Sequence, residues 1–259
     1  MATFLFDDVV FGPVHSRRLG VSLGMNLVPV NRKVCTFNCI YCECGWTSER
    51  HLPSDGFPSR ELITDSLRKK LSELRNSGIL PDAITYAGNG EPTLHPEFHG
   101  IITDSVEIRD EYAPGSKVAV LSNASLAHLP KVRMALEKVD LNILKLDSGI
   151  EKTYRTLNQP PPGLKLEKII ENLKLFKENL IIQTLFVRGR YKGTEIDNTS
   201  QEEISTLLGL YREISPDEVQ VYTIARDTPV GTLQKVPLED LESIAAEIGE
   251  LGIKTSVFP

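Results

Sequence analysis

Short apolar runs alternate along the chain with longer stretches in which apolar residues recur at helical spacing. Six of these runs have the length and composition of buried strands. They occupy residues 21–28, 83–87, 118–121, 141–146, 180–187 and 219–224, and a last run at 253–258 predicts an edge strand. In the segment 58–76, Leu67, Leu71 and Leu74 lie on one helical face, and Ser59 is suited to cap the helix. Further helices are expected near 96–111, 130–138, 164–178, 200–213 and 238–250.

The alternation of strands and helices predicts parallel βαβ units, so the fold class is α/β with a parallel sheet and outer helices. The count is six β/α units, fewer than the eight of a closed barrel in a chain of about this length. A partial, laterally open (β/α)6 barrel is therefore expected, with its core at about 21–250. The proline run at 160–162 is too short to separate domains, so residues 1–259 are expected to form a single domain.

Composition and charge narrow the function classes. Apolar residues make up 41% of the chain and charged residues 25%, which is ordinary for a globular protein. No run reaches the roughly 18 apolar residues of a membrane helix. The first residues lack the basic region of a signal peptide, so we expect a cytoplasmic protein with no membrane partner. A net charge of -6 gives no overall attraction to nucleic acid.

The cysteines are the strongest chemical signal. Cys35, Cys39 and Cys42 can place three thiolates around one metal centre, and Cys44 completes a cysteine loop at residues 35–44. Iron-sulfur clusters usually take four thiolates, so three ligands imply one iron with an open position. A tetrahedral zinc site on all four cysteines is the alternative, although zinc sites are usually built from two separated cysteine pairs. Cys44 is expected to be a free thiol near the cluster.

Polar residues follow the predicted strands, at the edge where parallel α/β folds bind ligands. Gly88, Asn89, Gly90 and Glu91 follow the second strand, where the glycines allow close backbone approach and Glu91 offers a negative charge to an ammonium group. The third strand ends at Ser122 and Asn123, and the fourth ends at Lys145, Asp147 and Ser148. Lys145 and Asp147 share one strand face, so they either point at a ligand or form a buried ion pair that steadies the rim.

Basic residues concentrate before the first strand and after the fifth. The candidates for substrate binding are Arg17, Arg18, Arg188 and Arg190, joined by Arg32, Lys33 and Lys192. Such residues are often simply solvated. If the strand assignments hold, they lie around the barrel mouth and could form a ring small enough for one anionic group. We therefore expect a small or locally recognised anionic substrate, with tRNA possible but not favoured.

The spacing C-x3-C-x2-C, with Tyr41 before the last cysteine, resembles the signature of the radical S-adenosylmethionine (SAM) superfamily. The resemblance implies a four-iron, four-sulfur cluster on Cys35, Cys39 and Cys42, with SAM chelating the fourth iron through its amino and carboxylate groups. It also implies that SAM is cleaved to methionine and a 5′-deoxyadenosyl radical. The partial barrel expected from the strand count is the core fold of this superfamily.

The same resemblance suggests which residues contact SAM. Residues 88–92 resemble a G-G-E-P segment that holds the SAM amino group, with Asn89 at the place of the first glycine and Gly88 before it. Ser122, Asn123, Asp147 and Ser148 match SAM-contacting positions, and Tyr41 and Lys145 complete the candidate cofactor site. Residues 12–20 and 88–96, with the cysteine loop, look most like a branch of iron-sulfur oxidoreductases similar to the radical enzymes of wybutosine synthesis on tRNA.

Several functions are compatible with these patterns. The leading hypothesis is a radical enzyme that abstracts hydrogen from an unidentified substrate and receives its electron from a donor such as flavodoxin or ferredoxin. A tRNA-modifying enzyme and an activase of a partner protein are alternatives within the same chemistry. A zinc- or iron-binding adaptor without turnover is the alternative from another class, and SAM cleavage separates it from the rest.

Overall fold

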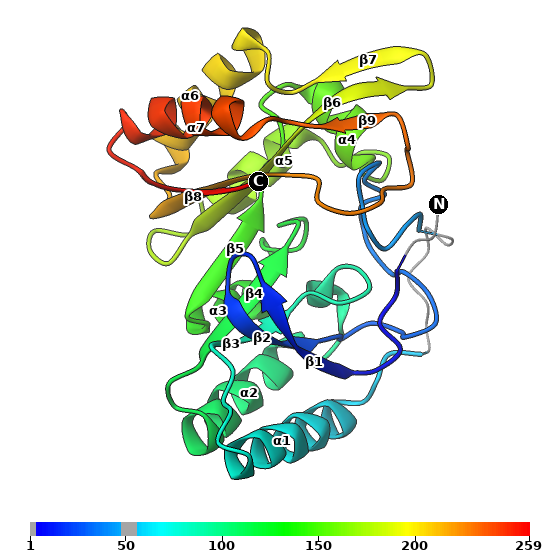
Figure 1. Cartoon of the computed structure of the whole chain (residues 1–259), viewed down its shortest axis with the longest axis vertical. Helices are drawn as coiled ribbons and strands as arrows, with labels where there is room; N and C mark the ends of the chain where they lie inside the picture. Colours follow the sequence, from blue (N-terminus) through cyan, green and yellow to red (C-terminus); the bar gives the residue numbers. More distant parts are fainter. Residues whose placement is uncertain (1–3, 48–55) are drawn as a thin grey trace.

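The structure is a computed structural model that describes residues 4–47 and 56–259. A curved, mostly parallel sheet forms its centre, and the helices cover its outer face (Figure 1). Six parallel strands run side by side in the order of the chain. They are β2 (Gly20–Met25), β3 (Ala83–Tyr86), β4 (Lys117–Ser122), β5 (Leu141–Lys145), β6 (Ile181–Tyr191) and β8 (Glu218–Thr223). These strands confirm the six expected units.

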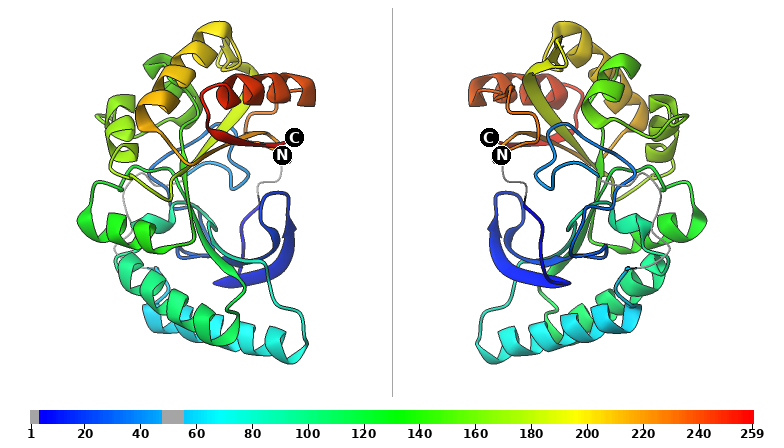
Figure 2. Two further views of the ribbon diagram at one scale, coloured as in Figure 1. Left: turned by 90° about the vertical axis from the view of Figure 1, so that its left-hand side faces the viewer. Right: turned by 90° about the vertical axis from the view of Figure 1, so that its right-hand side faces the viewer.

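The sheet does not close. At one end, β1 (Val10–Ser16) pairs antiparallel with β2, and at the other end β10 (Lys254–Phe258) pairs parallel with β8. The blue hairpin of β1 and β2 faces the red strand β10 across the open side (Figure 2). The predicted edge strand is therefore confirmed, whereas β1 was not expected from the sequence.

Each outer helix buries an apolar stripe against the sheet. In α1 (Arg60–Asn76), Ile63, Leu67 and Leu71 are fully buried, and the Ser59 hydroxyl caps the helix by accepting a hydrogen bond from the Leu62 amide. The other helices that were expected are α2 (Phe98–Tyr112), α3 (Pro130–Lys138), α5 (Leu166–Leu173), α6 (Gln201–Ile214) and α7 (Leu238–Gly249). In the described part of the chain, no helix is long and apolar enough to cross a bilayer.

Two parts of the fold differ from the expectation. The helix α4 (Glu151–Asn158) lies in a segment for which the sequence predicted no element, because its eight residues carry too few apolar positions to show helical spacing. Strand β6 continues past residue 187, where β7 (Thr194–Asp197) and β9 (Leu233–Lys235) pair with it antiparallel. This extension moves the end of β6 away from the barrel rim.

The cysteine loop is attached to the sheet by backbone pairing. Val34, just before the loop, forms an isolated parallel bridge with Gly90, which follows β3. The Val34 amide donates to the Asn89 carbonyl at 3.0 Å, and the Glu91 amide donates to the Val34 carbonyl at 3.0 Å. A Cβ atom at Gly90 would lie 1.8 Å from the Val34 carbonyl oxygen, so only glycine allows this approach.

We expect Gly90→Ala to lower the free energy of unfolding by about 1 to 3 kcal/mol, because the added methyl group must displace backbone. Denaturant unfolding measures this change. Gly209→Ala is the matched control, since Gly209 lies in α6 with nothing within 4 Å of an added Cβ atom. A Gly90→Ala protein as stable as the Gly209→Ala control would contradict the bridge.

Candidate active site

A cavity of about 260 Å³ lies at the carboxyl ends of the parallel strands and is lined by all four cysteines. The structure thus brings together the cysteine loop and several of the predicted site residues. Those that line the cavity are Arg17, Arg18, Cys35, Cys39, Tyr41, Cys42, Gly88, Gly90, Glu91, Ser122, Asn123 and Lys145. Asn89, Asp147 and Ser148 do not line it, and Arg188 and Arg190 line a different cavity.

Backbone hydrogen bonds attach the cysteine loop to the end of α4. The Asn38 amide donates to the Asn158 carbonyl at 3.0 Å, and the Ile40 amide donates to the Leu157 carbonyl at 2.9 Å. The side chain of Asn158 also lies 2.9 Å from the Tyr41 hydroxyl and 3.6 Å from the Cys39 sulfur. Asn158 is therefore a site residue that the sequence did not reveal, because the helix that carries it was not recognised.

The contacts of the Asn89 side chain explain why asparagine stands where the G-G-E-P pattern has glycine. Its side-chain amide forms two hydrogen bonds of 2.8 Å with the backbone of Phe6, one as acceptor and one as donor. This pairing fixes the N-terminal segment against the back of the turn, away from the cavity. An asparagine here therefore anchors the chain and leaves Gly88, Gly90 and Glu91 at the cavity wall.

The carboxylate of Glu91 joins two strand ends. It accepts hydrogen bonds from the amide and hydroxyl of Thr93, from the Ser122 hydroxyl at 2.8 Å and from the Asn123 amide at 2.8 Å. Burial raises the pKa of Glu91, although these hydrogen bonds favour the charged form. Asn123 in turn donates to the Thr36 hydroxyl and lies 3.6 Å from the Cys35 sulfur. Glu91 therefore couples β3 and β4 to the cysteine loop.

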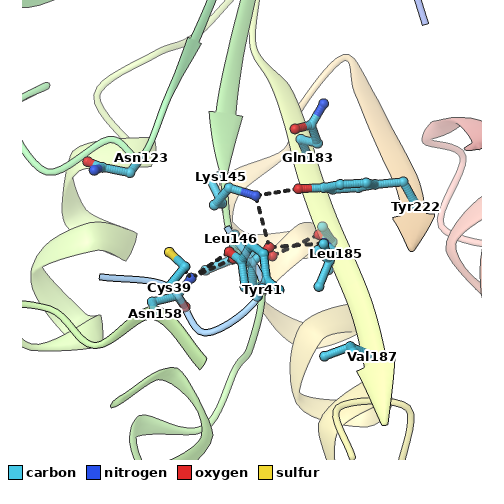
Figure 3. Close-up of polar contacts among 12 residues, drawn as sticks. Cys39, Tyr41, Asn123, Lys145, Leu146, Asn158, Gln183, Leu185, Val187 and Tyr222 are labelled. Carbon is cyan, nitrogen blue, oxygen red and sulfur yellow. Dashed lines mark hydrogen bonds and ion pairs between the residues drawn. The ribbon is translucent and has the colours of Figure 1, made fainter. Parts of the chain in front are cut away.

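Lys145 and Asp147 form a buried ion pair with an Nζ–Oδ1 distance of 3.5 Å (Figure 3). The Asp147 side chain is fully buried and accepts further hydrogen bonds from the Tyr41 hydroxyl, the Asn158 side chain and the Leu185 amide. Lys145 faces the cavity and donates to the Tyr222 hydroxyl. Burial opposes the charged form of Lys145, yet Asp147 and Tyr222 raise its pKa. Of the two interpretations, the structure shows the ion pair.

Ser148 forms its hydrogen bonds inside the protein, away from the cavity. Its hydroxyl lies 2.9 Å and 3.1 Å from the two carboxylate oxygens of Glu203 on α6. Neither Asp147 nor Ser148 reaches the cavity wall in this structure, since each is surrounded by protein partners. Direct contact of these two residues with SAM stays a prediction, and their positions give it no support.

The prediction that the basic residues form a single ring around the barrel mouth is wrong. Arg188 and Arg190 line a second cavity of about 520 Å³ beside β7 and β9, because the extension of β6 carries them away from the rim. Arg188 forms ion pairs there with Asp240 at 2.8 Å and with Asp197 at 3.6 Å. Arg17, Arg18 and Lys33 line the strand-end cavity.

The surroundings of the thiols suit thiolate ligands. A hydrogen bond from Cys44 lowers the pKa of Cys42 to about 5 against the effect of burial, and the nearby Lys33 ammonium contributes. Lys33 is buried and donates to the Gly45 carbonyl at 2.8 Å. Burial raises the pKa values of Cys35 and Cys39, and a bound metal would supply the charge that offsets it.

Comparison with known proteins identifies the class. Residues 33–190 match the family described as the Radical SAM superfamily. The chain therefore belongs to this superfamily and is an enzyme, as the cysteine motif predicted. A similar protein is the UPF0026 protein MJ1312 of Methanocaldococcus jannaschii, 33% identical over 248 residues, which are 94% of this chain and 72% of that protein.

Solved structures share the fold. A radical SAM methyltransferase from Sphaerobacter thermophilus has a TM-score of 0.62 at 15% identity, over 92% of this chain and 65% of that one. SuiB from Streptococcus suis bound to S-adenosylmethionine has a TM-score of 0.62 at 17% identity, over 90% of this chain and 50% of SuiB. Archaeal TYW1 has a TM-score of 0.52 at 16% identity, over 88% of this chain and 71% of that one. The chain thus spans between 50% and 71% of these proteins.

The cofactors of the superfamily are SAM and a four-iron, four-sulfur cluster, and the site fits them. Three thiols of one loop face one cavity, beside the amide groups of Asn123 and Asn158 and the Lys33 ammonium. Among the described residues, no three His, Cys, Asp or Glu side chains surround a single ion position. A cluster has no need of such convergence, because its thiolates bind different irons.

If Asp147 holds the rim from inside the protein, Asp147→Ala should lower the free energy of unfolding by about 3 to 5 kcal/mol, because it leaves the Lys145 charge unpaired. Denaturant unfolding of the apoprotein measures this loss. Asp65→Ala is the matched control, since Asp65 is 65% exposed in its pair with Arg68, and such pairs contribute less than about 1 kcal/mol. Wild-type stability combined with lost SAM affinity would instead favour direct contact between Asp147 and SAM.

Proposed function

We propose that Cys35, Cys39 and Cys42 hold the four-iron, four-sulfur cluster, and that the enzyme cleaves SAM reductively to abstract hydrogen from a small anionic substrate. The observation that carries this proposal is the convergence of these three thiols on one cavity at the strand ends, beside Gly88, Gly90 and Glu91. When bound, the cluster would supply one electron for cleavage of a carbon-sulfur bond of SAM to methionine and the 5′-deoxyadenosyl radical that abstracts the hydrogen atom.

The residues around the thiols then have defined tasks. The N–H groups of Asn123 and Asn158 point at the sulfurs of Cys35 and Cys39, where hydrogen bonds tune the reduction potential of a cluster. The buried Lys33 ammonium compensates thiolate charge close to Cys42. A small redox protein such as flavodoxin or ferredoxin donates this electron to the cluster.

The rim of the cavity is suited to bind and orient SAM. Gly88 and Gly90 bring backbone close to the cavity, and Glu91 lines it with a carboxylate that can accept a hydrogen bond from the SAM amino group. Ser122 and Asn123 are fixed by Glu91, so their polar groups keep one orientation. The sulfur of Cys44 lies 3.6 Å from the Gly88 carbonyl oxygen. We leave Cys44 outside the ligand set because the C-x3-C-x2-C spacing ends at Cys42.

Iron binding tests the ligand assignment. After anaerobic reconstitution the wild-type protein and Cys44→Ala should each hold about four irons, whereas Cys35→Ala, Cys39→Ala and Cys42→Ala should each lose most of the cluster. Iron and sulfide assays measure this, and addition of SAM should change the electron paramagnetic resonance spectrum of the reduced cluster. Loss of iron from Cys44→Ala with retention in Cys35→Ala would overturn the assignment.

A further inference from the structure

The turn between β1 and β2 lies at the open side of the sheet. Its residue Arg18 places the guanidinium carbon 4.8 Å from the ring centroid of Tyr222, which lies on β8 in the other half of the sheet. A hairpin from one end of the sheet thus contacts a strand near the other end through these two side chains. Both Arg18 and Tyr222 line the strand-end cavity. One part of the cavity wall is therefore formed by a cation held against an aromatic ring.

The guanidinium of Arg18 lacks a protein partner for one of its nitrogens. The Nη1 atom is buried and forms no hydrogen bond, and no carboxylate in the described part of the chain forms an ion pair with Arg18. Leaving a buried donor unsatisfied costs about 1 to 3 kcal/mol, and more for a charged group. Such a group in a cavity wall is explained by a ligand that supplies the missing acceptor.

The other cations near Arg18 already have partners. Arg226 pairs with Glu43 at 2.7 Å, and Lys145 pairs with Asp147 while its Nζ atom lies 5.0 Å from the Tyr222 ring centroid (Figure 3). Glu43 is a carboxylate near Arg18, but its partner is Arg226, so it does not satisfy the Arg18 guanidinium. The sequence pattern placed Arg18 among many basic residues, and the structure separates it from Arg188 and Arg190.

We propose that Arg18 binds a carboxylate or phosphate group of the substrate inside the strand-end cavity, with the Tyr222 ring fixing the orientation of the guanidinium. This assignment rests on the proposed function and deepens it, because it names the anchoring group. The planar guanidinium matches both oxyanions with two parallel hydrogen bonds. Because Arg18 lies in the wall of a cavity of about 260 Å³, the substrate group that it binds must be small enough to enter that cavity.

Two small probes separate carboxylate from phosphate chemistry. Acetate and methylphosphonate each carry a methyl group, so saturation-transfer NMR can follow both on the reconstituted, oxidised protein in the presence of SAM. We expect one probe to bind at least tenfold more tightly than the other, and Arg18→Gln to weaken the preferred probe at least tenfold. Arg18→Lys keeps the charge and should restore part of the affinity. Arg188→Gln, which changes the second cavity, should leave probe affinity within twofold of wild type.

Unchanged probe affinity in Arg18→Gln, or an equal loss in Arg188→Gln, would overturn the assignment. So would a loss of SAM affinity as large as the loss of probe affinity, because Arg18 would then belong to the SAM site. Failure of the proposed function would give a different result. The wild-type protein would then show no spectral change on addition of SAM, while Arg18→Gln would still weaken binding of the probe.

Discussion

The buried carboxylate of Glu91 holds the cavity rim together without a cationic partner among the described residues. Burying a charge is costly unless hydrogen bonds replace its water. Glu91 meets this requirement with four donors, from Thr93, Ser122 and Asn123, and its own backbone pairs with Val34. These bonds require the ends of β3 and β4 and the start of the cysteine loop to occupy fixed positions. The placement of the thiols follows from satisfying one carboxylate.

A second buried charge organises the other side of the same rim. Asp147 binds Lys145, Tyr41 and Asn158, and Asn158 reaches the Cys39 sulfur. The cysteine loop is thus fixed from β4 through Asn123 and from α4 through Asn158. Because each anchor is itself hydrogen-bonded, the thiols are preorganised before any metal binds. A cavity lined by Arg17, Arg18 and Lys145 as well as by the thiols is suited to hold a cofactor and an anionic substrate together.

Local patterns predicted the strands, the order of units and the cysteine motif, because each depends on residues close in sequence. Period-two alternation placed Lys145 and Asp147 on one face, yet it could not say that Asp147 meets Tyr41, 106 residues away. Asn158 was invisible for the same reason, since its role depends on Cys39 across the fold. The single basic ring failed because the antiparallel extension of β6, which displaces Arg188, is set by pairing with β7 and β9.

The central claim is that the fold presents three thiolates to a cavity in which SAM is cleaved. Mass spectrometry of 5′-deoxyadenosine, released after anaerobic reduction of the reconstituted protein with SAM, tests it most directly. The account predicts 5′-deoxyadenosine and methionine in equal amounts from the wild-type protein and from Cys44→Ala, and none above background from Cys42→Ala. Equal product from Cys42→Ala and wild type, or no product from a wild-type protein that holds its four irons, would contradict it.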